Sequence, residues 1–172
     1  MAHERYTRTN QKLYFAGLAV QHCRQAQQAS ALDGPGRALA EREAALFHLH
    51  GAVLGLCHEI AGFYRLADDG SPHIERFLQE SRLADTPSPE LLELAELIRQ
   101  PHSWLGLLLH AHGQLLQPPR GPAKAKPDVS MPLIALAAVD EEVELLGPET
   151  LEEWRGQLTR LALRFRQGMT ES

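Results

Sequence analysis

Hydrophobic residues recur at steps of three and four along most of this 172-residue chain, which is the spacing that lines one face of an α-helix. The strongest stripe predicts one uninterrupted helix over about residues 36–66 and consists of Leu46, Leu49, Val53, Leu56, Ile60 and Phe63. A second stripe, from Phe47 to Tyr64, makes the same segment apolar around most of its circumference. We therefore expect this helix to be central, with other helices packed around it.

Three glycines interrupt the side chains of this predicted central helix: Gly51, Gly55 and Gly62. A glycine inside a helix costs about 1 kcal/mol relative to alanine, so some other contact should compensate. Close crossing by a neighbouring helix is the favoured explanation, and a groove that receives a ligand is the alternative.

Further helices are expected on both sides of the central one. The first covers about residues 4–31, and the last begins near Pro148 and Glu149. Ser71-Pro72 and Ser88-Pro89 each combine a helix-capping residue with a proline suited to the first turn, so each predicts the start of a short helix. Another helix is expected from Trp104 to Leu115.

The segment 118–132 is rich in proline and lysine, which predicts an extended connector before the C-terminal helix. Residues 133–146 are apolar and then acidic, and either an irregular strap or a short helix fits them. No strand-like alternation accompanied by turn signals appears. We therefore predict an all-α fold, a single-domain helical bundle over residues 1–172.

Composition places the chain among globular proteins, with 44% hydrophobic and 23% charged residues. Its net charge of −5 disfavours nucleic acid and anionic lipid unless a local basic patch exists. The N-terminus lacks the apolar core of a signal peptide, and histidines interrupt the most apolar stretch, residues 44–64. We expect a cytoplasmic protein without a membrane partner. Cys23 and Cys57 form no CxxC pair and are interpreted as buried thiols in a reducing compartment.

The candidate site for chemistry is a polar cluster on the central helix: Arg42, His48, His50, His58 and Glu59. Residues two apart on a helix point about 200° away from each other, so His48 and His50 cannot both bind one metal. His50 and His58 share a side but are separated by roughly 12 Å of helical rise. Because His58 and Glu59 lie about 100° apart, a general-base pair is also disfavoured. We expect no metal and no cofactor.

The spacing of Arg42 and His48 resembles that of the arginine and histidine in the helical HEPN ribonucleases. About two such pairs are expected at random in this composition, and a six-residue step on a helix places the two side chains on different faces. A HEPN-like nuclease or a metal site therefore stays an alternative, behind an interpretation of these residues as packing or surface groups.

A second candidate site is a basic surface made of Arg5, Arg8, Lys12, Arg160 and Arg164. Each of these residues, like Arg166, is interpreted first as part of a solvated face. If the fold brought the two groups together, they would form a surface for anions or nucleic acid, with Tyr6 and Tyr14 nearby for stacking. A nucleic-acid-associated protein is therefore the alternative to the leading hypothesis.

Three stretches carry a resemblance to a known family: Ala2–Gly17, Arg42–Leu66 and Leu161–Arg166. The chain resembles an uncharacterised family of small gammaproteobacterial helical proteins, a domain of unknown function. The resemblance implies an all-helical fold and supplies no catalytic residues. The leading hypothesis is a non-enzymatic interaction protein that binds a protein partner or forms a homo-oligomer, because long apolar seams are present without an identifiable reaction centre.

Overall fold

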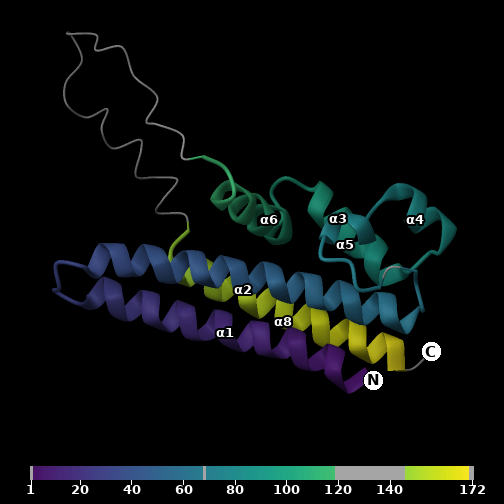
Figure 1. Ribbon diagram of the computed structural model, residues 1–172, viewed down its shortest axis with the longest axis horizontal. Coiled ribbons are helices and arrows are strands. Elements are labelled where there is room, and N and C mark those ends of the chain that lie inside the picture. Colours follow the sequence, from purple (N-terminus) through teal and green to yellow (C-terminus); the bar gives the residue numbers. More distant parts are fainter. Residues whose placement is uncertain (1, 68, 119–145, 171–172) are drawn as a thin grey trace, which may run out of the picture.

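The fold is a bundle of helices, seen in a computed structural model that describes residues 2–67, 69–118 and 146–170, with side chains from residue 6 onward. No strand occurs in these ranges, so the all-α prediction is confirmed. In Figure 1, α1, α2 and α8 lie side by side as long rods, and α3 to α6 lie along one side of α2. The helices are α1 (Ala2–Gln28), α2 (Gly34–Phe63), α3 (Ile74–Phe77), α4 (Glu80–Asp85), α5 (Pro89–Arg99), α6 (Trp104–Leu115) and α8 (Pro148–Thr170).

Helix α2 is the predicted central rod, and it is continuous from Gly34 to Phe63. It packs against α1 and α8 on one side and against α3, α5 and α6 on the other. Leu49, Val53 and Leu56 are completely buried, as their three- and four-residue spacing predicts. The apolar circumference of α2 therefore explains why other helices surround it.

The core divides into two clusters along α2. One surrounds the second half of the helix, where Leu56 and Ile60 meet Phe77 of α3, Leu94 of α5 and Leu158 of α8. The other surrounds the first half, where residues of α2 meet α1, α6 and the start of α8, and it consists of Ala16, Ala19, Val20, Ala45, Leu46, Leu49, Leu108, Ala111, Leu151 and Trp154. Helix α8 contributes to both clusters and thereby joins the two halves of the bundle.

Helices α1 and α2 approach most closely at Gly55. A Cβ atom added there would lie 2.6 Å from Thr9 Oγ1 and 3.3 Å from Thr9 Cα, and Thr9 is completely buried. At Gly51 the added atom would meet the aliphatic part of the Lys12 side chain at 3.2 Å. Close crossing by the preceding helix, the favoured explanation of these glycines, is therefore confirmed at both positions.

The C-terminus of α2 is closed by a residue in the left-handed conformation. Arg65 has φ 53°, and the Leu66 amide donates to the Ala61 carbonyl at 2.8 Å. This bond satisfies a carbonyl that the last turn of a helix would otherwise leave without a partner. Leu66 then turns back into the core, where it is buried.

The structure confirms one of the two predicted N-cap residues and contradicts the other. Ser88 accepts a hydrogen bond from the Leu91 amide at the start of α5, as predicted, and Ser103 accepts one from Gly106 at the start of α6. The prediction that Ser71 caps the next helix is wrong, since α3 begins at Ile74 and its N-cap position is His73. The Ser71 hydroxyl instead accepts from the His73 amide within the preceding turn.

Most of the predicted connector at 118–132 and of the segment 133–146 lies outside the described residues. The structure describes an end of each, at Pro118 and Leu146. The predictions for an extended connector, and for a strap or short helix after it, therefore stay predictions.

Helix α2 is long and apolar enough to cross a membrane by length and composition, with a mean hydropathy of 1.2 over its most apolar 18-residue window. Within the bundle, 61% of that window is buried against other parts of the protein. The core helix of a soluble protein has the same properties, so the expected cytoplasmic location stays a prediction.

We expect Gly55→Ala to destabilise the bundle by about 1–3 kcal/mol, because the new methyl group would push Thr9 and the backbone of α1 away from α2. Gly36→Ala is the matched control, since nothing lies within 4 Å of an added Cβ there and alanine favours the helix. Urea unfolding measures both variants. Equal stability of Gly55→Ala and the parent protein would contradict the close crossing.

Candidate functional site

The three histidines of the candidate polar cluster face three different neighbours. The His48 ring lies edge-on to Phe15 of α1, with ring centroids 5.4 Å apart. His50 stacks on His112 of α6, and His58 Nε2 lies 2.7 Å from the Ser71 carbonyl oxygen. Among the described residues, no group of three potential metal ligands occurs. Within the described residues, the three histidines of α2 therefore contact three different parts of the fold.

His48 and Arg42 also have different neighbours in the structure. Burial lowers the pKa of His48, and the nearby charge of Lys12 lowers it further. Its Nδ1 atom is buried with no hydrogen-bond partner in the described part of the chain. Arg42, in turn, acts electrostatically on the Cys23 thiol, where it opposes the effect of burial on the pKa. The HEPN-like pairing therefore has no geometric support.

Glu59 forms a buried ion pair with Arg166 of α8. The guanidinium donates two hydrogen bonds of 2.8 Å to the carboxylate, whose side chain is completely buried. Arg166 also donates to Asn10 Oδ1 at 3.0 Å and lies over the ring of Tyr6, both on α1. The bonds to Glu59 are the main reason that the pKa of Arg166 is raised. This network connects α1, α2 and α8.

The network corrects one prediction. Arg166 was interpreted as part of a solvated face, but its side chain is only 17% exposed. A buried carboxylate requires a paired cation, and Glu59 on the central helix has no access to water, so the arginine of the facing helix is drawn inward. Glu59 accepts hydrogen bonds from Arg166, and the adjacent His58 contacts the Ser71 carbonyl oxygen.

A stacked pair of imidazoles joins α2 and α6. The rings of His50 and His112 are 3.8 Å apart between centroids and 12° from parallel, and Phe47 lies edge-on to His112. Burial, followed by the charge of His112, lowers the pKa of His50 to about 4, and burial lowers the pKa of His112 as well. Glu75 of α3 opposes both shifts. Two neutral rings therefore pack as part of the helix interface.

The two cysteines are buried, as predicted. The Cys23 thiol donates to the Ala38 carbonyl oxygen at 3.4 Å, and burial raises its pKa. Burial raises the pKa of Cys57 to about 12. The thiolate is the reactive form of cysteine, and a raised pKa disfavours it. Both thiols therefore have low reactivity in the folded protein.

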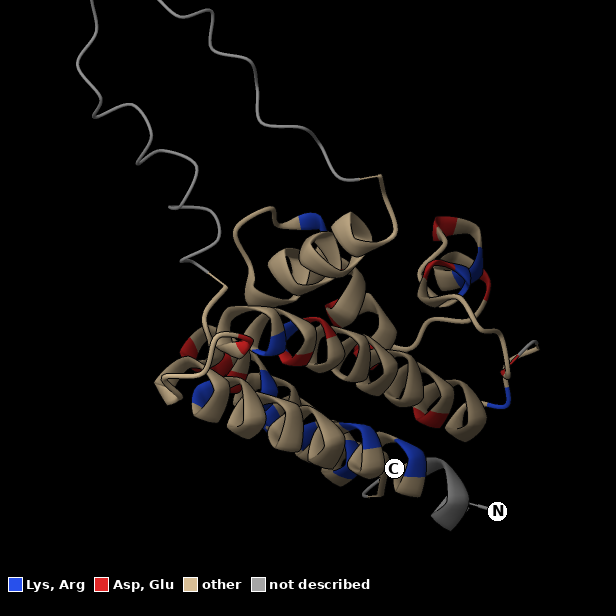
Figure 2. Ribbon diagram, turned by 60° about the vertical axis from the view of Figure 1, so that its left-hand side comes forward, with Lys and Arg blue, Asp and Glu red and all other residues tan. Residues whose placement is uncertain are grey.

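The described residues of the predicted basic surface have different neighbours in the structure. Lys12 packs against Gly51 of α2, whereas Arg164 reaches Glu93 of α5, with Nη1 to Oε2 at 3.0 Å. Arg8 is exposed and bonds to Gln11, Arg160 is exposed, and the side chain of Arg5 lies outside the described residues. Figure 2 shows that basic positions recur along α1 and α8, with acidic positions on the same and neighbouring helices.

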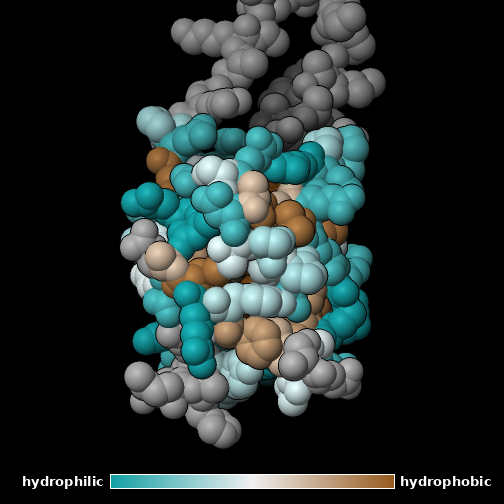
Figure 3. Space-filling view, turned by 90° about the vertical axis from the view of Figure 1, so that its right-hand side faces the viewer, coloured by the Kyte–Doolittle hydropathy of each residue, from teal (hydrophilic) through white to brown (hydrophobic). Residues whose placement is uncertain are grey.

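Hydrophobic side chains reach the surface in a few places. At the end of the bundle where α2 and α8 terminate, hydrophobic surface lies among hydrophilic surface (Figure 3), and Phe63, the last residue of α2, is 42% exposed. On α5 and α8, Leu92 is 44% and Leu163 is 55% exposed. These two leucines lie beside opposite charges, which makes their surroundings the candidate functional surface.

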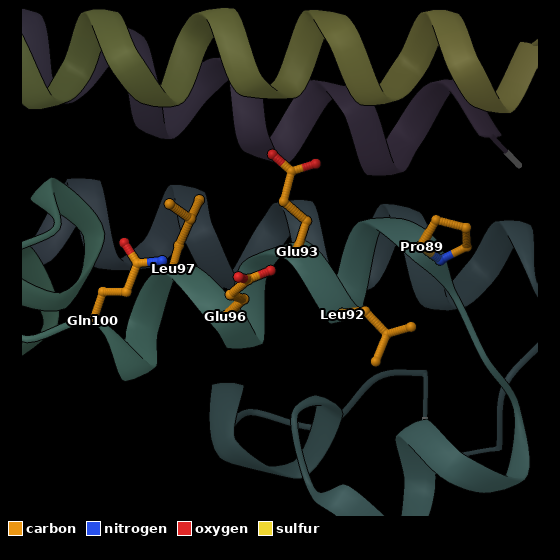
Figure 4. A pocket seen from close by; sticks show the side chains of 6 residues that line it. All are labelled: Pro89, Leu92, Glu93, Glu96, Leu97 and Gln100. Atoms are coloured by element: carbon orange, nitrogen blue, oxygen red, sulfur yellow. The ribbon is translucent and has the colours of Figure 1, made fainter.

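We call this surface the α5–α8 face, and it consists of Pro89, Leu92, Glu93, Glu96 and Leu97 of α5, Gln100 directly after α5, and Arg160, Leu163 and Arg164 of α8. The α5 residues line an open cavity of about 610 Å³ (Figure 4). In that view Glu93 points toward α8, while Leu92 points away from it. The sequence analysis did not predict this surface, because α5 and α8 are about 60 residues apart in the chain. It identified only the arginines of α8 as candidate residues.

Comparison with known proteins identifies a family for this chain. The model of a family described as "Family of unknown function (DUF6586)" matches residues 1–172. No curated protein and no solved structure matches the chain. The predicted resemblance to an uncharacterised family is therefore confirmed, and the gammaproteobacterial origin stays a prediction.

We expect Arg166→Met to lower the free energy of unfolding by about 3–5 kcal/mol, because it leaves the completely buried Glu59 carboxylate without a cation. Replacing Glu59 by Met as well should recover a large part of the loss. Arg99→Met is the control, since it removes the exposed ion pair with Glu80 and should cost less than about 1 kcal/mol. Similar losses for Arg166→Met and Arg99→Met in urea unfolding would refute the role of the network.

The stacked histidines predict that the protein loses stability in mild acid. An unfolded histidine binds a proton near pH 6.5, whereas folded His50 stays neutral until about pH 4, so the unfolded state binds more protons between these values. The free energy of unfolding should therefore fall as the pH decreases from 6.5 to 4, by at most about 1.4 kcal/mol per pH unit for this residue. His50→Gln should make this dependence shallower.

The control for the pH measurement is His102→Gln, which changes an exposed histidine in the turn before α6. Thermal unfolding followed by circular dichroism at several pH values measures all three proteins. If His50→Gln keeps the full pH dependence of the parent protein, the stacked pair is not its source.

Proposed function

We propose, for a chain that belongs to the DUF6586 family of unknown function, that this protein is a non-enzymatic interaction module that binds protein through the α5–α8 face. The observation that carries the proposal is the exposure of Leu92 and Leu163 beside acidic residues of α5 and arginines of α8. Exposed apolar surface bordered by charged groups is typical of protein contacts.

The form of the cavity supports a protein ligand. Sites for small molecules are enclosed clefts lined by several elements, with a few converging polar groups. The cavity on this face is open, and the residues that line it belong to the single helix α5 or, in the case of Gln100, directly follow it. Such a surface suits the side of another helix better than a small molecule.

The engagement of the internal polar groups supports a role without catalysis. Glu59 is held by Arg166, His50 by His112, and His58 by the Ser71 carbonyl. Each of these contacts joins α2 to another part of the described fold, and the three groups on α2 point toward different neighbours. A catalytic site requires groups that converge on a common point.

The pairing of arginines with carboxylates favours protein over nucleic acid as the partner. Arg24 pairs with Glu149, Arg155 with Glu152 and Arg164 with Glu93. A phosphate backbone is bound by cations that are not already neutralised, and the chain as a whole has a net charge of −5. The basic residues of α8 therefore support an interface with mixed charges.

A photo-crosslinking amino acid at Leu92 or Leu163 tests the proposal in cells that express the protein natively. We expect adducts of one or a few defined masses at both positions, and their loss when Glu96→Arg is added to the same chain. The matched control is Leu32, which is fully exposed in the turn between α1 and α2. Absence of adducts at Leu92, or the same adducts from Leu32, would overturn the proposal.

A further inference from the structure

The α5–α8 face carries acidic residues on one helix and basic residues on the other. Helix α5 contributes Glu93 and Glu96, and α8 contributes Arg160 and Arg164. Glu93 and Arg164 neutralise each other within the chain. Neither Glu96 nor Arg160 forms an ion pair with any part of the chain that the structure describes, so each is available to an oppositely charged partner.

The two helices run antiparallel, and their register places these two residues at the same level. Glu93 bonds to Arg164, and one turn away Glu90 Oε1 lies 4.0 Å from the position of a Cβ on Gly168. Moving three or four residues forward along α5 therefore corresponds to moving back by the same number along α8. By this register Glu96 and Leu97 lie level with Arg160, and Leu92 lies level with the turn that contains Leu163.

We propose that the partner of this face is a second copy of the same chain, an inference that rests on the proposed function and specifies its partner. A two-fold axis lying in the face and parallel to the helices turns α5 of one copy onto α8 of the other without changing their level. Glu96 then faces Arg160 of the partner subunit, and the same contact occurs a second time by symmetry. A face with one acidic and one basic side is complementary to itself in this orientation.

The exposed leucines fit the same arrangement. The rotation brings Leu92 against the turn that carries Leu163 of the partner subunit, so apolar surface that is 44% and 55% exposed in one chain becomes covered. Helix α5 has 11 residues and is roughly 16 Å long, so the interface is small. A small interface with charged contacts predicts a weak dimer, with a Kd of roughly 10–500 μM that rises with salt.

Charge reversal tests the dimer by sedimentation equilibrium of the full chain at low salt. Glu96→Arg alone and Arg160→Glu alone should each raise the Kd at least fivefold, because each places like charges opposite each other twice per dimer. An equimolar mixture of these two variants should associate about as strongly as the parent protein, since both contacts become complementary in the heterodimer. A change confined to one chain's own fold cannot produce this recovery.

Arg37→Glu is the control variant, because Arg37 is exposed in the first turn of α2 and forms no ion pair within the described residues. It should leave the Kd unchanged, and thermal unfolding of every variant verifies the fold. A strict monomer at 500 μM, or a mixture of the two reversed variants that stays monomeric, would overturn self-association. If adducts to another protein still form at Leu92, the proposed function survives that result; if they are also absent, both proposals fail.

Discussion

The burial of α2 on most of its circumference is the constraint on which the rest of the structure depends. Leu49, Val53, Leu56 and Ile60 are completely buried, because other helices cover the sides of this rod that carry them. At Gly55 the covering is so close that Thr9 occupies the place of a side chain.

The same burial decides what the polar residues of α2 can do. A polar group that faces the interior of the bundle is stabilised by a partner on the neighbour that it faces, because little water reaches it there. Glu59 faces α8 and pairs with Arg166, while His50 faces α6 and stacks on His112. Polar residues that are close in the sequence are therefore directed to different helices, and they strengthen the bundle instead of forming one site.

The proposed function depends on the outside of the bundle, where Glu93 of α5 and Arg164 of α8 form an ion pair. The ion pair between Glu93 and Arg164 marks the register of the two helices. That register leaves Glu96 and Arg160 at the same level without partners of their own in the described chain, beside exposed leucines. An internal contact thus lies beside the groups that face outward.

Local patterns in the sequence were sufficient to predict the fold class, the continuous helix α2, the limits of the long helices to within a few residues, and the burial of Cys23 and Cys57. These properties depend on neighbours three or four positions apart, which periodicity records directly. The inward position of Arg166, the stacking of His112 on His50 and the pairing of α5 with α8 join residues 60 or more positions apart. Only the packing of the helices in three dimensions brings those residues together, so the tertiary structure alone decided them.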